Sequence, residues 1–440
     1  MRLRSILLLT CSTAFAGCSA EAPAVEAPRQ IVLVTIDTLR ADHCSLYGYA
    51  RDTTPFLREL AESATVFENT SATSSWTAPS MASLFTSLPP RSHGVLAGNF
   101  RKEGISQQDY LDERFSTLPE TLSQHGYETF GVSTNAHLTH QTGFGQGFDE
   151  LTALWWKDAE DANTEALAFA ERLEDAERSF LWVHYFDPHY PYEAREPWFE
   201  SYQAEERTMP EGVDPAGVHL VLDGLDRYDS EINHTDASLR RLFRELAVGE
   251  DALVVVTSDH GEAFFEHGRH AHGLSLFEEE TRVPLLIRYP GQTTAARVET
   301  PVSILDVYPT LLELASLPVP PGLAGRSLAA AVRGEPLEPQ AIVSELDRSG
   351  RIERTLRWKH WKLYRQEQPS TFTRLYDLEK DPDEQSDLAA DQPKKARELA
   401  RRWDEWADDW PRVRASRQAR SFGEAELEKL RVLGYLESED

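Results

Sequence analysis

The chain has 440 residues, which suits one large α/β domain with a smaller appended unit. Its 73 acidic and 45 basic residues give a formal net charge of −28. This surplus argues against nucleic acid or an anionic membrane surface as the main partner. An anionic substrate would need local positive groups, which a metal ion and helix N-termini supply.

The N-terminus has the pattern of a targeting segment. Arg2 and Arg4 precede an apolar run at residues 6–9, which is too short to span a bilayer, and small residues follow up to Cys18. This end resembles a bacterial lipoprotein signal, which implies removal of residues 1–17 as a signal peptide and lipidation of Cys18. Simple secretion after cleavage at Ala16 is the alternative. The resemblance implies a protein of the bacterial cell envelope, periplasmic or extracytoplasmic, held at the membrane by its lipid anchor only.

Residues 18–30 are rich in Ala, Pro and Glu and form a tether without apolar periodicity. After removal of the leader two cysteines remain, Cys18 and Cys44. If Cys18 carries lipid, Cys44 has no partner, so disulfides do not hold the fold together.

Short apolar runs ending in polar residues organise the next part of the chain. They cover residues 31–36, 130–133, 180–185 and 253–257, with helical stretches at 54–64, 163–176 and 228–246 between them. The pattern predicts an α/β fold, a doubly wound and mostly parallel sheet flanked by helices. Ligands of such sheets bind beyond the carboxyl ends of the strands. Polar groups follow four of these strand ends, at Asp37, Asn135, Asp187 with His189, and Asp259 with His260.

The C-terminal part changes in character near residue 340. Residues 283–288 and 341–346 are predicted strands, with a helix at 305–314 between them. Residues 357–364 and 373–378 alternate aromatic and polar side chains, as strands of a small antiparallel sheet do. A polar helix is predicted at 393–410. We therefore divide the chain into a catalytic domain, residues 31–340, and a C-terminal subdomain of antiparallel sheet plus helix, residues 341–440.

The stretch SSWTAPSMASLFTSLPP, which contains Thr77, predicts a buried helix. Ala82, Leu84, Phe85 and Leu88 recur at helical spacing, and Pro79 is tolerated only in the first turn. Thr77 should therefore lie at the N-terminal end of the helix, where backbone N–H groups and the helix dipole favour an anion. A hydroxyl there is a candidate nucleophile. The alternative is that Thr77 only caps the helix.

Asp37, Asp259 and His260 offer two carboxylates and an imidazole, a ligand set suited to one divalent metal ion, with the Thr77 Oγ completing it. The imidazole and the small number of carboxylates favour zinc or manganese. Calcium, which prefers six to eight oxygens, is a further possibility. The alternative for both aspartates is that they cap the turns after their strands.

The motifs IDTLRADHCSLYGY, TAPS, SDHGE, TRVPLLI and LYDLEKDPDEQSDL together resemble the sulfatase branch of the alkaline phosphatase superfamily. The resemblance runs from about Gln30 to the C-terminus. It implies the doubly wound sheet, the small C-terminal sheet and a metal ion at the strand ends.

Three departures from true sulfatases bear on the chemistry. Their Cys-x-Pro-Ser-Arg run, whose first residue becomes formylglycine, is here Thr77-Ala78-Pro79-Ser80-Met81. Their paired Asp-Asp after the first strand is here Asp37-Thr38, and Thr134 stands where they carry a sulfate-binding lysine.

The replacements are similar to the catalytic domains of phosphoethanolamine transferases and lipoteichoic acid synthases, which use a threonine nucleophile and a single metal ion. This similarity implies that His189 and His272 bind the transferred group or exchange protons with it. Asn135, at a strand end, is a candidate substrate contact. We expect His184 to be a satisfied core histidine rather than a ligand. His267 should be solvated or lie behind the site residues, and the acidic run 278–280 should be a solvated face.

The expected function is metal-dependent hydrolysis of phosphate esters through a covalent Thr77 intermediate, on a small-molecule, glycan or lipid ester. Three alternatives remain. They are a sulfuric ester hydrolase, a phosphotransferase to a glycan or lipid, and a non-catalytic binding protein. Transferases of that kind usually carry several membrane spans.

Overall fold

The computed structural model describes residues 27–96, 98–99, 105–205 and 218–421. The predicted signal peptide and the lipidation site at Cys18 lie outside these residues. Within them, no helix combines the length and the apolar character needed to cross a membrane.

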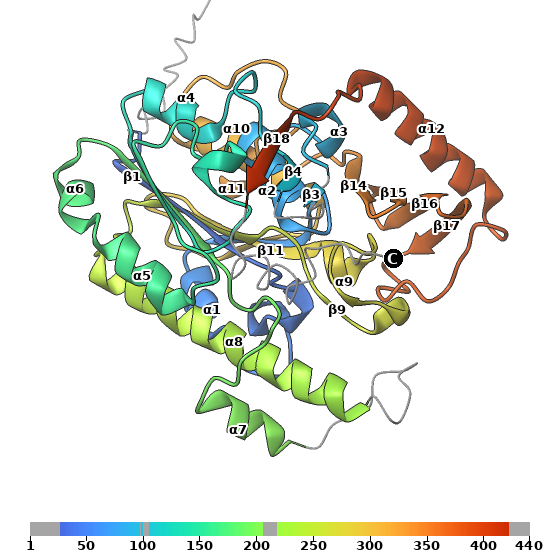
Figure 1. Cartoon of the computed structure of the whole chain (residues 1–440), viewed down its shortest axis with the longest axis horizontal. Helices are drawn as coiled ribbons and strands as arrows, with labels where there is room; N and C mark the ends of the chain where they lie inside the picture. The colour runs from blue at the N-terminus through green and yellow to red at the C-terminus, as the bar shows by residue number, and fades with distance from the viewer. Residues whose placement is uncertain (1–26, 97, 100–104, 206–217, 422–440) are drawn as a thin grey trace, which may run out of the picture.

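A large central sheet carries the fold (Figure 1). Its strand order is β12-β2-β11-β8-β1-β7-β5-β6, with β13 also paired to β2. β8, β1, β7, β5 and β6 are parallel, whereas β11 runs antiparallel to both β8 and β2. The predicted mostly parallel α/β fold is confirmed. The bounds are β1 Gln30–Ile36, β2 Thr65–Ser71, β5 Glu128–Ser133, β6 Glu150–Ala153, β7 Ser179–Tyr185, β8 Leu253–Ser258, β11 Arg282–Arg288, β12 Ala296–Val298 and β13 Val302–Ser303.

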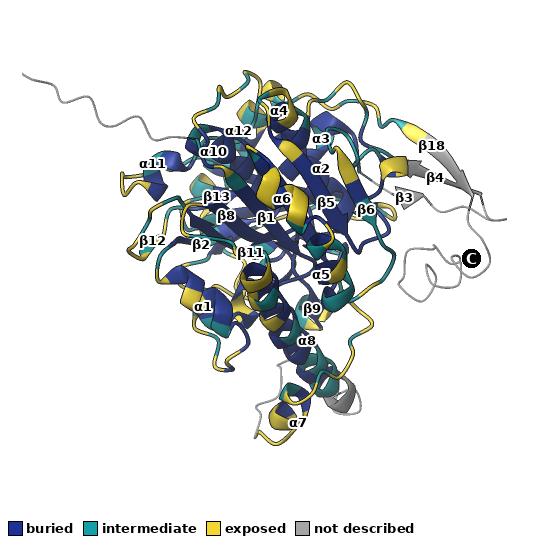
Figure 2. Ribbon diagram, turned by 90° about the vertical axis from the view of Figure 1, so that its left-hand side faces the viewer, coloured by how far each residue is buried: buried dark blue, intermediate teal, exposed yellow. Residues whose placement is uncertain are grey.

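Helices cover both faces of the sheet because its central strands are apolar on both sides. In β1, Ile31 and Leu33 belong to one buried cluster and Val32 and Val34 to another. Figure 2 shows this buried centre between the helical layers. The first cluster includes residues of α2 (Thr77–Thr86), α4 (Leu118–Gln124), α10 (Val307–Leu314) and α11 (Ala329–Val332). The second includes residues of α1 (Pro55–Ala61), α5 (Ala159–Leu167), α6 (Ala170–Asp175) and α8 (Val218–Glu245).

Two helix predictions need correction. The stretch 163–176 is two helices, α5 and α6, interrupted at Ala168 and Phe169. Phe169 is buried there against Phe130 of the sheet, with ring centroids 5.1 Å apart, so tertiary packing decides the break. α8 begins ten residues before the predicted start at 228.

The C-terminal unit is a four-stranded antiparallel sheet, β14-β15-β16-β17, with α12 packed on β15 and β16. The bounds are β14 Ile342–Arg348, β15 Arg351–Trp358, β16 Trp361–Gln368, β17 Phe372–Asp377 and α12 Pro393–Asp409. The run 357–364 is not one strand, because the chain turns between β15 and β16 with Lys359 at a φ of 58°. The predicted small antiparallel sheet and its helix are otherwise confirmed.

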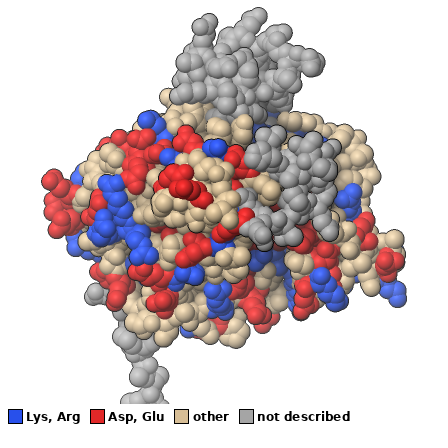
Figure 3. Space-filling model, turned by 90° about the horizontal axis from the view of Figure 1, so that it is seen from below, with Lys and Arg blue, Asp and Glu red and all other residues tan. Residues whose placement is uncertain are grey.

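Shorter elements complete the described chain. They are α3 (Pro90–His93), α7 (Trp198–Gln203), α9 (Glu278–Thr281), β3 (Gly98–Asn99), β4 (Ile105–Asp109), β9 (Ala263–Phe264), β10 (His270–Ala271) and β18 (Arg417–Ser421). β18 pairs with β4, which joins the end of the described chain to the catalytic domain. On the face seen in Figure 3, acidic and basic side chains are interspersed.

Candidate active site

Four adjacent parallel strands bring the candidate residues together. In the order β8, β1, β7, β5, their carboxyl ends lie at one edge of the sheet. Asp259 and His260 follow β8, Asp37 follows β1, and Asn135 lies two residues beyond β5. The first residue of α2, Thr77, meets the same edge.

Asp37, Asp259 and His260 form a buried cluster whose ligand atoms lie within 4.8 Å of one another. His260 Nε2 lies 3.4 Å from Asp37 Oδ1 and 3.5 Å from Asp259 Oδ2. Neither of these carboxylate oxygens has a hydrogen-bond partner among the described residues. The other oxygen of Asp259, Oδ1, accepts hydrogen bonds from the backbone N–H groups of His260 at 2.9 Å and of Thr38 at 3.3 Å.

The tautomer of His260 follows from its second nitrogen. Nδ1 lies 2.8 Å from the carbonyl oxygen of Gly261, and because a carbonyl only accepts, Nδ1 carries the proton. The lone pair of Nε2 therefore faces the two carboxylates. A histidine that ligates a metal ion through one nitrogen while the other donates to a carbonyl is a common arrangement in metal sites.

Burial without a counter-charge shifts the pKa values of this cluster. It raises the pKa of Asp37 to about 7 and holds the pKa of Asp259 well above its ordinary value, while it lowers the pKa of His260. Two buried carboxylates with unpartnered oxygens are costly unless a cation lies between them. The donor set and its orphaned oxygens therefore fit one divalent metal ion held by Asp37, Asp259 and His260.

Thr77 lies beside this cluster with its hydroxyl held by two neighbours. Its Oγ1 is 3.3 Å from His260 Nε2 and accepts a hydrogen bond of 3.3 Å from Asn135 Nδ2. The same amide donates to Asp37 Oδ2 at 2.6 Å, so Asn135 links the nucleophile candidate to a metal-ligand candidate. Trp76, not Thr77, is the N-cap, and Thr77 is the first helical residue. Thr77 therefore does not cap the helix, contrary to the alternative interpretation.

The first turn of α2 is anchored so that its N-terminus faces the strand ends. Every residue of the helix is buried, and Ser80 Oγ donates to the carbonyl of Asp259 at 2.6 Å. The N–H groups of a first helical turn have no acceptor within the helix. Those of Thr77 and Ala78 lie in this first turn, whereas Pro79 has no N–H.

His184 is a satisfied core histidine, as expected, and it also contacts a metal-ligand candidate. Its Nε2 lies 3.3 Å from Asp37 Oδ2, and its Nδ1 lies 2.8 Å from Thr35 Oγ1, which also accepts from Trp182 Nε1 at 3.0 Å. Burial lowers the pKa of His184 to about 4, which favours the neutral ring. The contact with Asp37 arises because β7 lies directly beside β1, a neighbourhood that no local pattern in the sequence reveals.

His189 and His272 are buried beside the cluster. Their ring centroids are 4.7 Å apart, and His272 is 4.6 Å from the ring of His260. Nδ1 of His189 donates to the carbonyl of Tyr190 at 2.5 Å, and Nδ1 of His272 lies 3.1 Å from Glu262 Oε1. Because Glu262 holds Nδ1 of His272, Nε2 is the nitrogen of that ring that can meet a ligand. Burial holds the pKa of each ring well below its ordinary value.

Glu262 is a site residue that the sequence reasoning missed. It is buried, and burial raises its pKa to about 7. Glu262 lies ten residues before His272 in the chain, and its contact with Nδ1 orients the His272 ring. Its place in the SDHGE run was the available signal, since the run continues past the predicted metal ligands.

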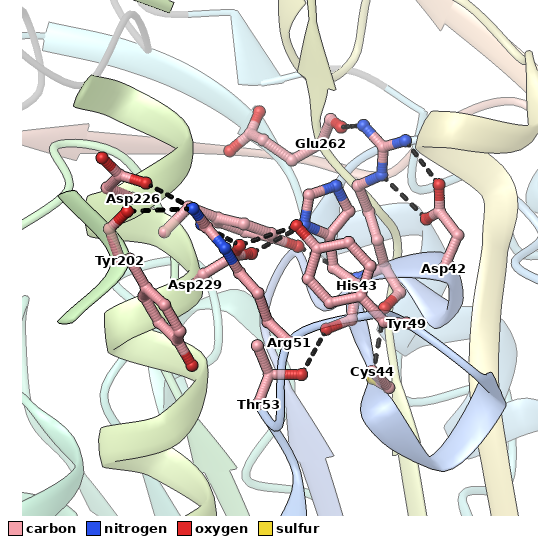
Figure 4. A network of polar contacts seen from close by, with 12 residues as sticks. Asp42, His43, Cys44, Tyr49, Arg51, Thr53, Tyr202, Asp226, Asp229 and Glu262 are labelled. Atoms are coloured by element: carbon pink, nitrogen blue, oxygen red, sulfur yellow. Dashed lines mark hydrogen bonds and ion pairs between the residues drawn. The ribbon is translucent and has the colours of Figure 1, made fainter. Parts of the chain in front are cut away.

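The loop after β1 is held by charged contacts (Figure 4). Arg40 binds Asp42 Oδ2 and Glu266 Oε1, both at 2.7 Å, and donates to the carbonyl of Glu262 at 2.9 Å. Further along, His43 and Arg51 both bind Asp229 of α8, at 2.7 and 2.6 Å. These contacts tie the metal-ligand loop to a long helix and thereby limit its movement.

Thr134 and Met81, which stand where sulfatases carry a lysine and an arginine, have structural roles. Thr134 donates its hydroxyl to the carbonyl of His184 at 3.1 Å and accepts from the Phe186 N–H at 2.8 Å. Met81 is fully buried in the cluster under α2. Neither side chain is therefore available as a substitute for the charged sulfatase residue.

The expectation for the acidic run 278–280 was wrong, and that for His267 was right in part. Glu279 and Glu280 are buried, and Glu278 pairs with Lys362 Nζ at 2.8 Å. His267 lies away from the cluster, but it is held by Glu279 Oε1 at 2.8 Å and stacks on Phe277. The tertiary fold brings basic residues of the C-terminal sheet onto this run, which sequence composition does not show.

Comparison with known proteins identifies the family. The sequence profile of the family described as "Sulfatase" matches residues 29–317, and that described as "N-sulphoglucosamine sulphohydrolase, C-terminal" matches residues 266–405. Arylsulfatase K of Bos taurus is 35% identical over 175 residues, which is 36% of this chain and 32% of that protein. An ulvan-active sulfatase of Formosa agariphila is 26% identical over 345 residues, 71% of this chain and 66% of that one.

Among solved structures, the phosphonate monoester hydrolase of Agrobacterium radiobacter is similar in fold, with a TM-score of 0.71 at 20% identity, covering 87% of this chain and 96% of that one. The sequence match to arylsulfatase K, by contrast, covers about a third of that protein's length. Because the family profile covers well over half of the described fold and includes the strand ends that carry the cluster, the chain belongs to the sulfatase family.

Proposed function

We propose that the protein is a metal-dependent ester hydrolase in which the Thr77 hydroxyl is the nucleophile, and that phosphorus esters are its substrates. The observation that carries the proposal is the position of Thr77. Its Oγ1 stands at the N-terminus of α2, 3.3 Å from His260 Nε2. A hydroxyl, the candidate metal ligands and the amide end of a helix meet at this point.

Asp37, Asp259 and His260 would hold the metal ion, which supplies charge for the ester oxygens and lowers the pKa of a bound hydroxyl. In the first step, a bond forms between Thr77 Oγ1 and phosphorus, and the bond to the alcohol oxygen breaks. The Thr77 proton leaves to a base, and the departing alcohol oxygen receives a proton. His189 and His272 are suited to these transfers because their rings lie beside the candidate metal ligands, His272 at 4.6 Å from the ring of His260 and His189 at 4.7 Å from that of His272.

In the second step, water attacks the phosphorus and releases Thr77. One imidazole accepts a proton of this water, the bond from phosphorus to Oγ1 breaks, and Oγ1 takes up a proton to restore the hydroxyl. Asn135 donates to Thr77 Oγ1 and so holds the side chain in one rotamer during both steps.

The preference for phosphorus over sulfur follows from the residue type at position 77. A formylglycine hydrate has a second hydroxyl that lets a sulfated intermediate collapse by elimination, whereas a threonine ester must wait for attack by water. Thr134 and Met81, at the positions of the charged sulfatase residues, are occupied by backbone contacts and by the core. The fold neighbour named as a phosphonate monoester hydrolase supports the same preference.

A sulfuric ester hydrolase is the second candidate. The sulfatase profile and the relatives named as sulfatases favour it.

A panel of aryl esters with one leaving group decides between the two. The wild type should hydrolyse the phosphodiester, phosphate monoester or phosphonate faster than the matching sulfate. Thr77→Ala should lower the rate by at least about a hundredfold, because the nucleophile is gone, while Thr77→Ser should retain measurable turnover. Acid quenching should trap phosphate on Thr77, detected by mass spectrometry.

A sulfate ester turned over faster than every phosphorus ester, in a reaction that Thr77→Ala abolishes, would establish the second candidate. Rates unaffected by Thr77→Ala would contradict both.

A further inference from the structure

Phe265 combines a strained backbone with an exposed aromatic side chain. It follows β9 and has a φ of 75°, in the left-handed region that a bulky residue rarely adopts. A glycine would take the same backbone without strain. Phe265 is also 42% exposed, so burial of its ring does not compensate for the strain. Strain of this kind gathers at binding sites, and Phe265 is therefore a candidate for a role in binding.

The turn that carries Phe265 is closed by backbone hydrogen bonds. The N–H of Phe265 donates to the carbonyl of Arg269 at 2.6 Å, and the N–H of Gly268 donates to the carbonyl of Phe265 at 3.0 Å. The flanking strands β9 and β10 are antiparallel, with Phe264 opposite His270. Phe264 is buried whereas Phe265 is exposed, so the turn holds the Phe265 ring at the surface.

Two further rings lie beside that of Phe265. The His270 ring is 5.1 Å from it, and the Tyr190 ring is 6.2 Å from His270, both between centroids. Tyr190 is 37% exposed. Among the large hydrophobic side chains that the structure describes, only Tyr190, Phe265 and Val319 are exposed, so two of the three belong to this group. We call Tyr190, Phe265 and His270 the aromatic rim, and an exposed group of this kind is typical of a binding site.

The aromatic rim adjoins the two imidazoles of the active site. Tyr190 directly follows His189, whose Nδ1 donates to the Tyr190 carbonyl at 2.5 Å. His270 lies two residues before His272, in β10. The rings of His189 and His272 are 4.7 Å apart, so the two segments that carry the rim meet at these imidazoles. A ligand bound beside His189 and His272 would therefore have the exposed rings next to it.

The chemistry of the rim differs from that of the metal-ligand cluster. Asp37, Asp259 and His260 suit a metal ion and the charged group that it binds. The Phe265 ring has no charge and no hydrogen-bond donor, so it suits an apolar part of a ligand. Aromatic side chains bind flat rings in offset-stacked or edge-to-face arrangements, with centroids about 4.5–7 Å apart.

We propose that the aromatic rim is a subsite that binds the alcohol portion of the ester, and that this alcohol carries a ring with an apolar face. The inference rests on the proposed function, because it places the ring beside the imidazoles that exchange protons with the ester. It deepens that function by naming the class of alcohol, one with an aromatic or saturated ring instead of a short alkyl chain. The alternative is that Phe265 only packs the turn between β9 and β10.

The test compares methylphosphonate, phenylphosphonate and cyclohexylphosphonate, which share one anionic group. None contains an ester bond, so calorimetric titration of the full-length, metal-loaded protein measures binding without turnover. The wild type should bind phenylphosphonate at least about tenfold more tightly than methylphosphonate. Equally tight binding of cyclohexylphosphonate would indicate a saturated ring, such as that of a sugar. Tight binding of phenylphosphonate alone would indicate an aromatic alcohol, and either result supports the subsite.

Phe265→Gly separates binding from packing, because it removes the ring and relieves the strained backbone. Its melting temperature should equal or exceed that of the wild type. The ratio of the phenylphosphonate and methylphosphonate affinities should nevertheless fall by about 3- to 10-fold. Phe265→Tyr should keep the ratio. Val319→Ala is the matched control, since it truncates an exposed apolar side chain between α10 and α11, and it should leave the ratio within about twofold.

The outcomes separate the inference from the proposed function, which is decided by the dependence of turnover on Thr77. A wild type that binds the three phosphonates equally, or binds none of them, overturns the inference even if Thr77→Ala abolishes hydrolysis. An unchanged ratio in Phe265→Gly also overturns it, and a lowered melting temperature in that case would show that the ring packs the turn. If Phe265→Gly lowers the ratio but Thr77→Ala leaves hydrolysis intact, the subsite stands and the proposed nucleophile is wrong.

Discussion

Asp37 and Asp259 each bury a carboxylate oxygen that has no hydrogen-bond partner among the described residues, and the lone pair of His260 Nε2 faces both. This is the arrangement expected of ligands to a cation. Behind it, His184, Thr35 and Trp182 form a chain of contacts that orients Asp37. Such contacts behind a ligand fix its rotamer and tune its affinity for the metal ion.

At this scale we predict that metal content and activity can be separated by substitution. Asp259→Asn should lose at least about 90% of the bound metal and the activity with it, because a neutral amide replaces an anionic ligand. Thr77→Ala should lose activity but keep most of the metal, since Asp37, Asp259 and His260 remain. Metal analysis of the purified variants checks both expectations. An unchanged metal content after replacement of both Asp37 and Asp259 would contradict the assigned ligands.

At the scale of elements, α1 is capped by a residue of another helix. Its N-cap Thr54 makes no side-chain cap, and Asp236 of α8 accepts from the N–H groups of Phe56 and Leu57 at 2.7 and 3.0 Å. Burial raises the pKa of Asp236 to about 7 despite these bonds. The stability of the contact between α1 and α8 should therefore depend on pH.

The sign of this sensitivity follows from proton binding. Between its unfolded value of 3.8 and about 7, Asp236 binds more proton in the folded state than in the unfolded state. Its contribution to stability is therefore largest at low pH and is lost as the pH rises through this window, with a slope of at most about 1.4 kcal/mol per pH unit. Asp236→Asn does not titrate and should lose this slope.

Urea unfolding across this pH range measures the effect. The free energy of unfolding of wild type minus that of Asp236→Asn should decrease as the pH rises. Parallel pH profiles for the two proteins would show that the carboxyl of Asp236 has an ordinary pKa.

At the scale of the whole molecule, buried ion pairs join the C-terminal sheet to the catalytic domain. Glu345 of β14 is buried and binds Arg91 of α3 at 2.8 Å and Arg354 of β15 at 3.1 Å. Arg91 also lies over the rings of Trp403 and Trp406 of α12. These contacts explain how a hairpin of the small sheet, with Arg348 at its tip, keeps its position beside the active site.

Glu345→Gln should lower the free energy of unfolding by about 3–5 kcal/mol, because it leaves two arginines without their buried counter-charge. The exposed pair Arg401–Glu405, 2.9 Å apart, provides the control. Glu405→Gln should change stability by less than about 1 kcal/mol. Denaturant unfolding of the three proteins makes the comparison. Equal stabilities for Glu345→Gln and Glu405→Gln would mean that the interface does not depend on this pair.

Much of the fold and part of the candidate site could be predicted from local patterns. The apolar runs predicted β1, β5, β7 and β8 within a few residues, because strands buried on both faces must be continuously apolar. Pro79 and the helical spacing after it located the start of α2 at Thr77. Since parallel strands end at one edge, the polar residues that follow them could be expected to meet, as Asp37, Asn135, Asp259 and His260 do.

Only the tertiary structure decides which residues that are distant in sequence become neighbours. His184 contacts Asp37 because β7 is hydrogen-bonded to β1, and Glu278 forms an ion pair because Lys362 of β16 reaches it. Arg348 approaches Trp76 because β14 packs against β2 and the segment that follows it, across a sequence separation of more than two hundred residues. Local sequence determines which backbone an element adopts and which face it buries. The partner that meets that face depends on the packing of the whole chain, and so do the charges that the partner brings.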